Sequence, residues 1–264
     1  MLIGRRQASA DEDQTARAYR TIRRMIVDGG LPPGDRMSHR VLAEKLGLGR
    51  SPVRDAIIQL EAEGLVVQRG QKGILLREPS PKEFADIYEL RLVMEPFFAE
   101  RAAILADTVQ LASLRESCEK LDAAAAQPDL QPWLSQEENL RLVYQLDMRF
   151  HATILAAAGN SIASRLFSSA QVLAHTFAWV PGRRPGSPDR LGVSAKEHRG
   201  IFDAIAARDP AAARERMRQH VLDAIPAVTG RYAEIVQSDR DAAERQAAAR
   251  AAAAVRGRQR GKRT

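Results

Sequence analysis

The sequence predicts a mainly α-helical protein in two parts: a short N-terminal unit ending in a β-hairpin, and a longer, all-α antiparallel bundle. Three observations predict this architecture. Aromatic residues make up only 5% of the 264 residues and alanine is frequent, which favours helices over a β-sandwich or barrel. Strand-like runs occur only between residues 65 and 78. From residue 79 onward, after a Pro-Ser-Pro separator, the apolar spacing is helical throughout.

Composition and charge exclude several classes of protein. The single cysteine, Cys118, excludes an intrachain disulfide framework and a Cys-rich zinc site. No apolar run approaches 18 residues and the first residues lack the apolar stretch of a secretory signal, so we expect a cytoplasmic protein with no membrane span.

The net charge of +7 is unevenly distributed along the chain. Residues 1–78 carry 14 basic and 10 acidic side chains, residues 79–238 carry 18 and 20, and residues 239–264 carry 8 and 3. Basic ends around a mildly acidic middle indicate a polyanionic partner for one part of the chain and a different role for the middle.

The first helix is predicted over residues 14–28, after residues 1–13, which we expect to be disordered. Ala18, Ile22 and Ile26 recur on one helical face, with arginines opposite, as in a helix that packs one side against a core. A Gly-Gly pair and a rigid LPPG turn end this helix.

Two further helices are short. Ser38 precedes an amphipathic segment in which we expect Val41, Leu42 and Leu46 to face the core, and a Gly-Leu-Gly triplet ends it. Ser51 and Pro52 are then interpreted as the N-cap and first residue of a third helix.

The third helix and the segment after it complete the N-terminal unit. Val53, Ile57 and Leu60 keep the spacing of a core-facing stripe. The run LVVQRGQKGILLRE then predicts two short strands joined by a turn that carries Arg69 and Lys72.

This order of elements is that of a winged helix-turn-helix. In that arrangement the third helix fits the DNA major groove and the hairpin reaches the neighbouring backbone or minor groove. Arg50 and Arg54, four residues apart at the start of the third helix, have side chains suited to a guanine edge or a phosphate. The alternative is a solvated cationic surface on an ordinary helical hairpin.

The run LPPGDRMSHRVLAEKLGLGRSPVRDAIIQLEAEGLVVQRGQKG resembles the DNA-binding domain of the GntR family of bacterial transcription regulators. The resemblance covers about residues 15–78 and implies a DNA-binding domain over 14–78. Gly49 departs from the family, which usually has Ser or Thr there, so a side-chain phosphate contact is missing. Carried over by position, the implied DNA contacts are Arg40, Arg50, Ser51, Arg54, Arg69 and Gly70.

Residues 79–236 predict six antiparallel helices, the first with a capping box formed by Ser80 and Glu83. Bundles of this kind place ligand sites between inward-facing side chains. The expected helices lie near 81–105, 108–125, 134–157, 161–179, 191–207 and 210–234.

Four polar residues of the bundle are spaced to converge. Asp147 and His151 are four residues apart on one helix, while His198 and His220 lie at similar distances on either side of a short turn. A carboxylate and three imidazoles predict a site for a divalent transition metal, with zinc favoured and nickel or manganese as alternatives. The alternative is a set of hydrogen-bonded histidines in an ordinary core.

The runs ELRLVMEPFFAERAA, DMRFHATILAAAGN and EHRGIFDAIAARDPAAARERMRQH resemble the FCD effector-binding domain of the FadR subfamily of GntR regulators. The resemblance implies that Asp147, His151, His198 and His220 are the metal ligands. Six helices place the chain nearer the VanR-like branch, where the metal helps hold a carboxylate effector. Arg91 matches the ELR motif and is implied to bind that effector, the alternative being an ion pair with Glu95.

The last segment, residues 237–264, is basic and rich in Ala and Arg, and either adds non-specific DNA affinity or solubilises the chain. The sequence as a whole predicts a homodimeric, non-enzymatic transcription regulator, interpreted as a repressor. It would bind operator DNA, a metal and a small carboxylate effector. One rival is a metal-dependent enzyme acting on a small acid and fused to a DNA-binding domain. The other is an architectural DNA-binding protein with no ligand.

Overall fold

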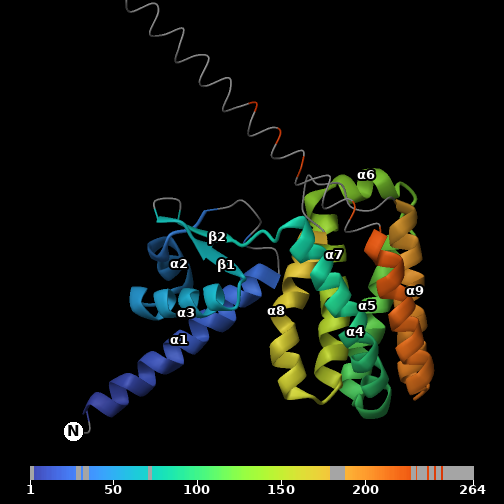
Figure 1. Ribbon diagram of the computed structural model, residues 1–264, viewed down its shortest axis with the longest axis horizontal. Helices are drawn as coiled ribbons and strands as arrows, with labels where there is room; N and C mark the ends of the chain where they lie inside the picture. Colours follow the sequence, from blue (N-terminus) through green and yellow to red (C-terminus); the bar gives the residue numbers. More distant parts are fainter. Residues whose placement is uncertain are drawn as a thin grey trace, which may run out of the picture.

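The computed structural model describes residues 3–27, 31, 36–70, 73–178 and 188–226, together with positions 230, 237, 241 and 245. It has the two parts that the sequence predicts, a small unit of helices and a hairpin beside a bundle of long helices (Figure 1).

The N-terminal unit is a winged helix-turn-helix. Its three helices enclose an apolar core in which Ile22, Ile57 and Leu60 are fully buried, and its two strands pair antiparallel with Val67 opposite Leu75. Its elements are α1 (Ile3–Val27), α2 (His39–Leu46), α3 (Arg50–Ala62), β1 (Val66–Gln68) and β2 (Ile74–Leu76).

Three local predictions for this unit differ from the structure. Helix α1 begins at Ile3, within the segment expected to be disordered, since alanine, arginine and glutamine there favour a helix. Val41 is 44% exposed, because Leu42 and Ala43 take the buried side of the short α2. Helix α3 begins at Arg50 with Gly49 as its N-cap, so Pro52 lies inside the first turn, where no backbone N–H is needed.

The wing is anchored to the segment before α2. Met37 and Ile74 exchange backbone hydrogen bonds of 3.0 and 2.7 Å. Next to this bridge Gly73 adopts φ +78°, and a Cβ at Gly73 would lie 2.6 Å from the carbonyl oxygen of Met37. Glycine is required at this position, because the backbone is in the left-handed region and the Met37 carbonyl leaves no room for a Cβ atom.

The C-terminal part is the antiparallel bundle. The predicted capping box at its first helix is present, with Ser80 and Glu83 each accepting a backbone hydrogen bond from the other. A last helical stretch covers residues 210–226. The labelled helices are α4 (Pro81–Leu105), α5 (Thr108–Ala125), α6 (Leu130–Ser135), α7 (Glu137–Ala157), α8 (Ser161–Ala178) and α9 (Pro188–Ala206).

The expectation of six helices omits α6, which the sequence marks as a break. Pro132 is the third residue of α6 and lies in the first turn, where a missing N–H costs nothing. Leu130 and Trp133 pack against a small apolar cluster that includes Leu121 and Val143. Tertiary packing therefore makes a short helix from a segment whose local sequence favours a loop.

The two parts of the chain share a core. The apolar cluster of the winged helix continues into Phe84 and Tyr88 of α4 and into Val172 and Leu173 of α8. Figure 1 shows α8 beside α1 and α3. The bundle therefore contacts the DNA-binding unit through buried side chains.

No helix in the described ranges is long and apolar enough to cross a membrane. Most of the basic segment 237–264 and the end of the predicted helix 210–234 lie outside the described residues.

Candidate metal centre and DNA-binding surface

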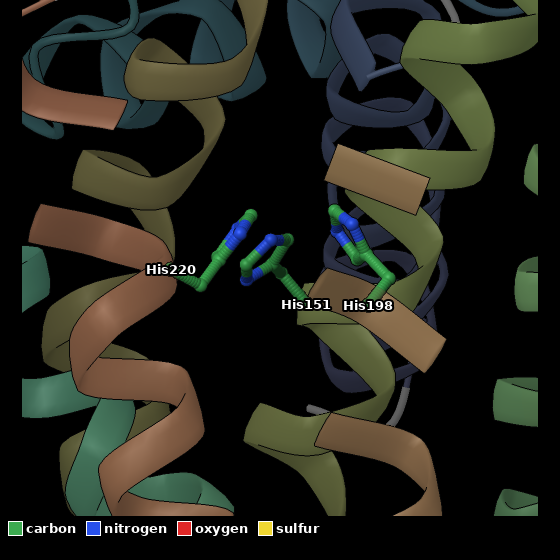
Figure 2. A group of neighbouring side chains, drawn as sticks. All are labelled: His151, His198 and His220. Carbon is green, nitrogen blue, oxygen red and sulfur yellow. The ribbon is translucent and has the colours of Figure 1, made fainter. Parts of the chain in front are cut away.

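Three histidines from three different helices meet in the core of the bundle. His151 comes from α7, His198 from α9 and His220 from the helical stretch 210–226. Each offers a ring nitrogen, and these nitrogens all lie within 4.8 Å of one another (Figure 2). All three side chains are buried, so the predicted convergence of the three imidazoles is present in the structure.

Asp147, the fourth predicted ligand, lies beside this group. One turn before His151 on α7, its Oδ1 is 3.2 Å from Nε2 of His198 and 4.0 Å from Nε2 of His151. The residue Asp147 is 8% exposed, so its carboxylate is almost fully removed from water.

The hydrogen bonding of His198 shows that this arrangement fits a cation. Its Nδ1 lies 2.6 Å from the carbonyl oxygen of Ser194, which can only accept, so Nδ1 carries the proton. In a neutral ring, Nε2 then presents a lone pair towards Asp147, which also has only lone pairs to offer. Two acceptors at 3.2 Å repel each other unless a metal ion or a proton lies between them.

His220 is oriented by an acidic residue outside the cluster. Its Nδ1 donates to Oε2 of Glu197 over 2.7 Å, and both carboxylate oxygens of Glu197 accept hydrogen bonds from Arg190 at 3.2 and 3.3 Å. Burial, reinforced by the neighbouring His198, lowers the pKa of His220 well below its ordinary value, so this ring is neutral at pH 7. A neutral imidazole held at Nδ1 presents Nε2 as a ligand.

His151 also has a carboxylate beside its ring, on α4. Its Nδ1 is 2.9 Å from Oε2 of Glu95, and Glu95 is held by Nε and Nη2 of Arg91 at 2.7 and 3.3 Å. Burial by itself would raise the pKa of Glu95, but Arg91 and His151 outweigh it and hold the pKa well below its usual range. Two of the three imidazoles therefore each lie against a carboxylate that forms an ion pair with an arginine.

Arg91, predicted to bind an effector, is buried in this second layer around the histidines. Its guanidinium lies 4.7 Å from the centre of the Tyr88 ring as well as against Glu95. The ion pair with Glu95, which the sequence offered as the alternative, is thus present, and Nη1 takes no part in it.

Sequence reasoning missed the residues that orient the ligands. Glu197 directly precedes His198, yet it supports His220 on the neighbouring helix. The sequence indicates Glu95 only as a partner of Arg91 and gives no signal for Arg190. A helical spacing of four residues links Arg91 to Glu95, but no spacing rule connects either carboxylate to its histidine, because those contacts cross between helices.

The DNA-contact candidates lie on the surface of the winged helix. All six, at positions 40, 50, 51, 54, 69 and 70, are exposed, and Arg40 pairs with Glu44 at 2.9 Å. The Gly49 N-cap makes no side-chain hydrogen bond to α3, so the first N–H groups of that helix have no side-chain cap. A winged helix with exposed arginines, attached to a helical bundle with a buried histidine cluster, is typical of winged-helix transcription regulators.

Comparisons with known proteins agree with this class. Residues 14–76 match the family described as bacterial regulatory proteins, gntR family, and residues 86–223 match the FCD domain. The chain belongs to the GntR family of transcription regulators and carries an FCD domain. Its relatives and family are regulators of transcription, which favours that role over the rival enzyme.

Named relatives match about four fifths of this chain and nearly all of their own length. The HTH-type transcriptional repressor GlaR of Escherichia coli is 31% identical over 80% of this chain and 93% of its own. The HTH-type transcriptional regulator LutR of Bacillus subtilis is 28% identical over 81% of this chain and 100% of its own. Among solved structures, E. coli McbR/YncC has the same fold, with a TM-score of 0.65 and 19% identity over 83% of this chain and 98% of its own.

Proposed function

We propose that this chain is a cytoplasmic, homodimeric repressor whose operator binding is controlled by a small carboxylate effector held at a metal centre. The observation that carries the proposal is the buried convergence of Asp147, His151, His198 and His220 in a bundle that packs against a DNA-reading domain. A ligand bound there contacts α7, α9 and the stretch 210–226 at once, so it favours one arrangement of these helices.

The DNA-binding half of the proposal rests on α3 and the wing. Arg50 and Arg54 are exposed and four residues apart, so both lie at the N-terminal end of α3 on one side. We assign them to base edges and phosphates of the major groove, and Arg69 with Gly70, at the exposed end of the wing, to the adjacent backbone. Arg40 and Ser51 complete the proposed phosphate contacts.

The test uses operator DNA selected in vitro from a random pool. Arg50→Ala and Arg54→Ala should each weaken operator binding by about 1–3 kcal/mol, measured by fluorescence anisotropy at fixed salt. Arg149→Ala removes another exposed arginine, which pairs with Glu116 in the bundle, and should leave operator affinity unchanged. Full operator affinity in both α3 variants would remove α3 from the DNA interface.

For the metal we propose zinc, with nickel and manganese as alternatives, held by Asp147 and the three histidines. The ion would act as a Lewis acid that attracts a carboxylate oxygen of the effector. Arg91 supports this choice of effector, because its guanidinium lies in the same core and its Nη1 is not used by Glu95.

Thermal unfolding of the full chain tests the effector class. A panel of small carboxylic acids should contain members that raise the melting temperature of the zinc-loaded protein and not that of the metal-stripped protein. The corresponding alcohols and amines should have no effect. Stabilisation by acids that is equal in His198→Ala would show that they bind elsewhere.

Helix α8 links the bundle to the DNA-binding unit through a polar contact. The carboxylate of Glu63, at the end of α3, accepts a hydrogen bond from Tyr19 of α1 at 2.6 Å and another from Ser169 of α8 at 3.0 Å. Burial and the contact with Glu63 raise the pKa of Tyr19 to about 12, so its hydroxyl remains a donor. A shift of α8 on effector binding would therefore act directly on the recognition helix.

A further inference from the structure

A large apolar side chain lies in the middle of the exposed side of α3. Ile58 is 47% exposed, although Ile57 beside it is fully buried. At about 100° per residue, Ile58 lies about 160° around the helix from Ala56 and Leu60, which are both fully buried. Within the described part of the chain, Ile58 belongs to none of the buried apolar clusters. Its side chain therefore points away from the core that α3 covers.

The side chains around Ile58 on this side of α3 are polar. The nearest around the helix are exposed: Ser51, Arg54 and Asp55, about 20°, 40° and 60° away. Arg50, one turn before Arg54, is also exposed, and neither arginine pairs with an acidic side chain of the described residues. We call this surface the α3 outer face; its residues are Arg50, Ser51, Arg54, Asp55 and Ile58.

The C-terminal end of α3 has a different role. Glu61 accepts hydrogen bonds of 2.8 and 2.7 Å from the backbone and side chain of Gln68 in the wing. Glu63 accepts from Tyr19 of α1 and Ser169 of α8. Two carboxylates that hold neighbouring elements repel phosphates. The part of α3 suited to a polyanion therefore extends from Arg50 to Ile58 and ends there.

An isoleucine side chain has neither a hydrogen-bond donor nor an acceptor, which limits what it recognises in DNA. It gains nothing from a phosphate or from the polar edge of a base. In the major groove, the apolar group that base edges present is the C5-methyl of thymine. A protein partner is disfavoured, because apolar protein contacts use contiguous patches and the neighbours of Ile58 on the α3 outer face are polar.

We propose that Ile58 is a specificity-determining residue that contacts the C5-methyl group of a thymine in the operator. The inference rests on the proposed function, because it requires α3 in the major groove. Ile58 lies four residues after Arg54, about 6 Å further along the helix axis, which is roughly two base-pair steps of about 3.4 Å. With α3 lying along the groove, the thymine is about two base pairs from the base that Arg54 contacts.

Replacing thymine by uracil tests the contact, because uracil lacks only the methyl group and forms the same base pair. The operator is selected in vitro from a random pool, and binding is measured by fluorescence anisotropy at fixed salt. In each half-site, uracil at one thymine should weaken binding of the unchanged chain about 3- to 10-fold, the effect of one buried methyl group. Uracil at thymines outside the half-sites should have no effect.

Variants of the full chain identify the side chain that reads the methyl group. Ile58→Ala should bind the thymine and uracil operators equally well, whereas Ile58→Val keeps a branched apolar side chain and should retain most of the discrimination. Val109→Ala alters an exposed valine of α5 in the bundle and should discriminate like the unchanged chain. Because Ile58 lies outside the core, Ile58→Ala should leave the melting temperature nearly unchanged, which excludes unfolding as the cause.

The outcomes separate this inference from the proposed function. A half-site with no uracil-sensitive thymine, or a sensitive thymine that stays equally sensitive in Ile58→Ala, overturns the role of Ile58. The proposed regulator stands in either case if Arg50→Ala and Arg54→Ala still weaken operator binding. A chain that selects no operator, or that keeps full operator affinity in both arginine variants, overturns both.

Discussion

Removing the carboxylate of Glu197 should weaken metal binding without removing a ligand. Its Oε2 accepts the Nδ1 proton of His220 at 2.7 Å, and this bond fixes which ring nitrogen faces the cluster. Glu197→Ala loses one hydrogen bond to a charged acceptor, a contribution of about 1.5–3 kcal/mol. At 1.4 kcal/mol per factor of ten this is about a 10- to 100-fold loss of affinity, the range typical of residues that orient metal-bound histidines.

The assay is competition of the full chain with a chromophoric zinc chelator. Glu197→Gln retains an oxygen that accepts from Nδ1, so it should recover most of the affinity lost in Glu197→Ala. Glu215→Ala removes an exposed glutamate that pairs with Arg218 on the surface, and should bind zinc like the unchanged chain. Wild-type affinity in Glu197→Ala would refute the positioning role, and equal loss in Gln and Ala variants would refute the hydrogen-bond explanation.

Three further predictions concern coupling, the core and pH. Ser169→Ala removes one of the two donors to Glu63 and should shrink the change in operator affinity that an effector acid causes, while operator affinity without effector stays nearly constant. Ile57→Ala, at a fully buried position of α3, should lower the free energy of unfolding in guanidinium by about 2–5 kcal/mol. The backbone N–H of Ser80, then Arg77, lowers the pKa of Glu83 to about 2, so its carboxylate stabilises the fold above about pH 4.5 and loses that effect towards pH 2. Glu83→Gln should remove this acid-side dependence, with a size below about 1 kcal/mol because the side chain is half exposed.

The fold was predictable from the sequence because its local signals agree with its tertiary contacts. The capping residues Ser38 and Ser80 each accept the backbone hydrogen bond expected of an N-cap, and the core stripe of α3 is buried as its spacing indicates. The errors lie where packing overrides local preference. Helix α6 forms despite its proline because Trp133 packs against an apolar cluster. Val41 is exposed because the eight-residue α2 buries only a narrow face.

The candidate metal centre was predictable only in part. Asp147 and His151 share a helix, and the turn between α9 and the stretch 210–226 brings His198 to His220, so spacing and topology suffice for the inner residues. Glu95 and Glu197 each reach a histidine on another helix, and no one-dimensional pattern encodes which side chains meet across a bundle. Their identification required the three-dimensional structure.

Calorimetric titration of the metal-stripped full chain with zinc measures whether the buried histidine cluster binds a metal ion. We predict one ion per chain for the unchanged protein and for His39→Ala, whose histidine lies in α2 of the DNA-binding unit. His198→Ala and His220→Ala should each lose most of the affinity, since each deletes a ligand in the cluster. A chain that binds no zinc, nickel or manganese, or whose His198→Ala and His220→Ala variants bind as tightly as His39→Ala, would contradict the metal-dependent control proposed here.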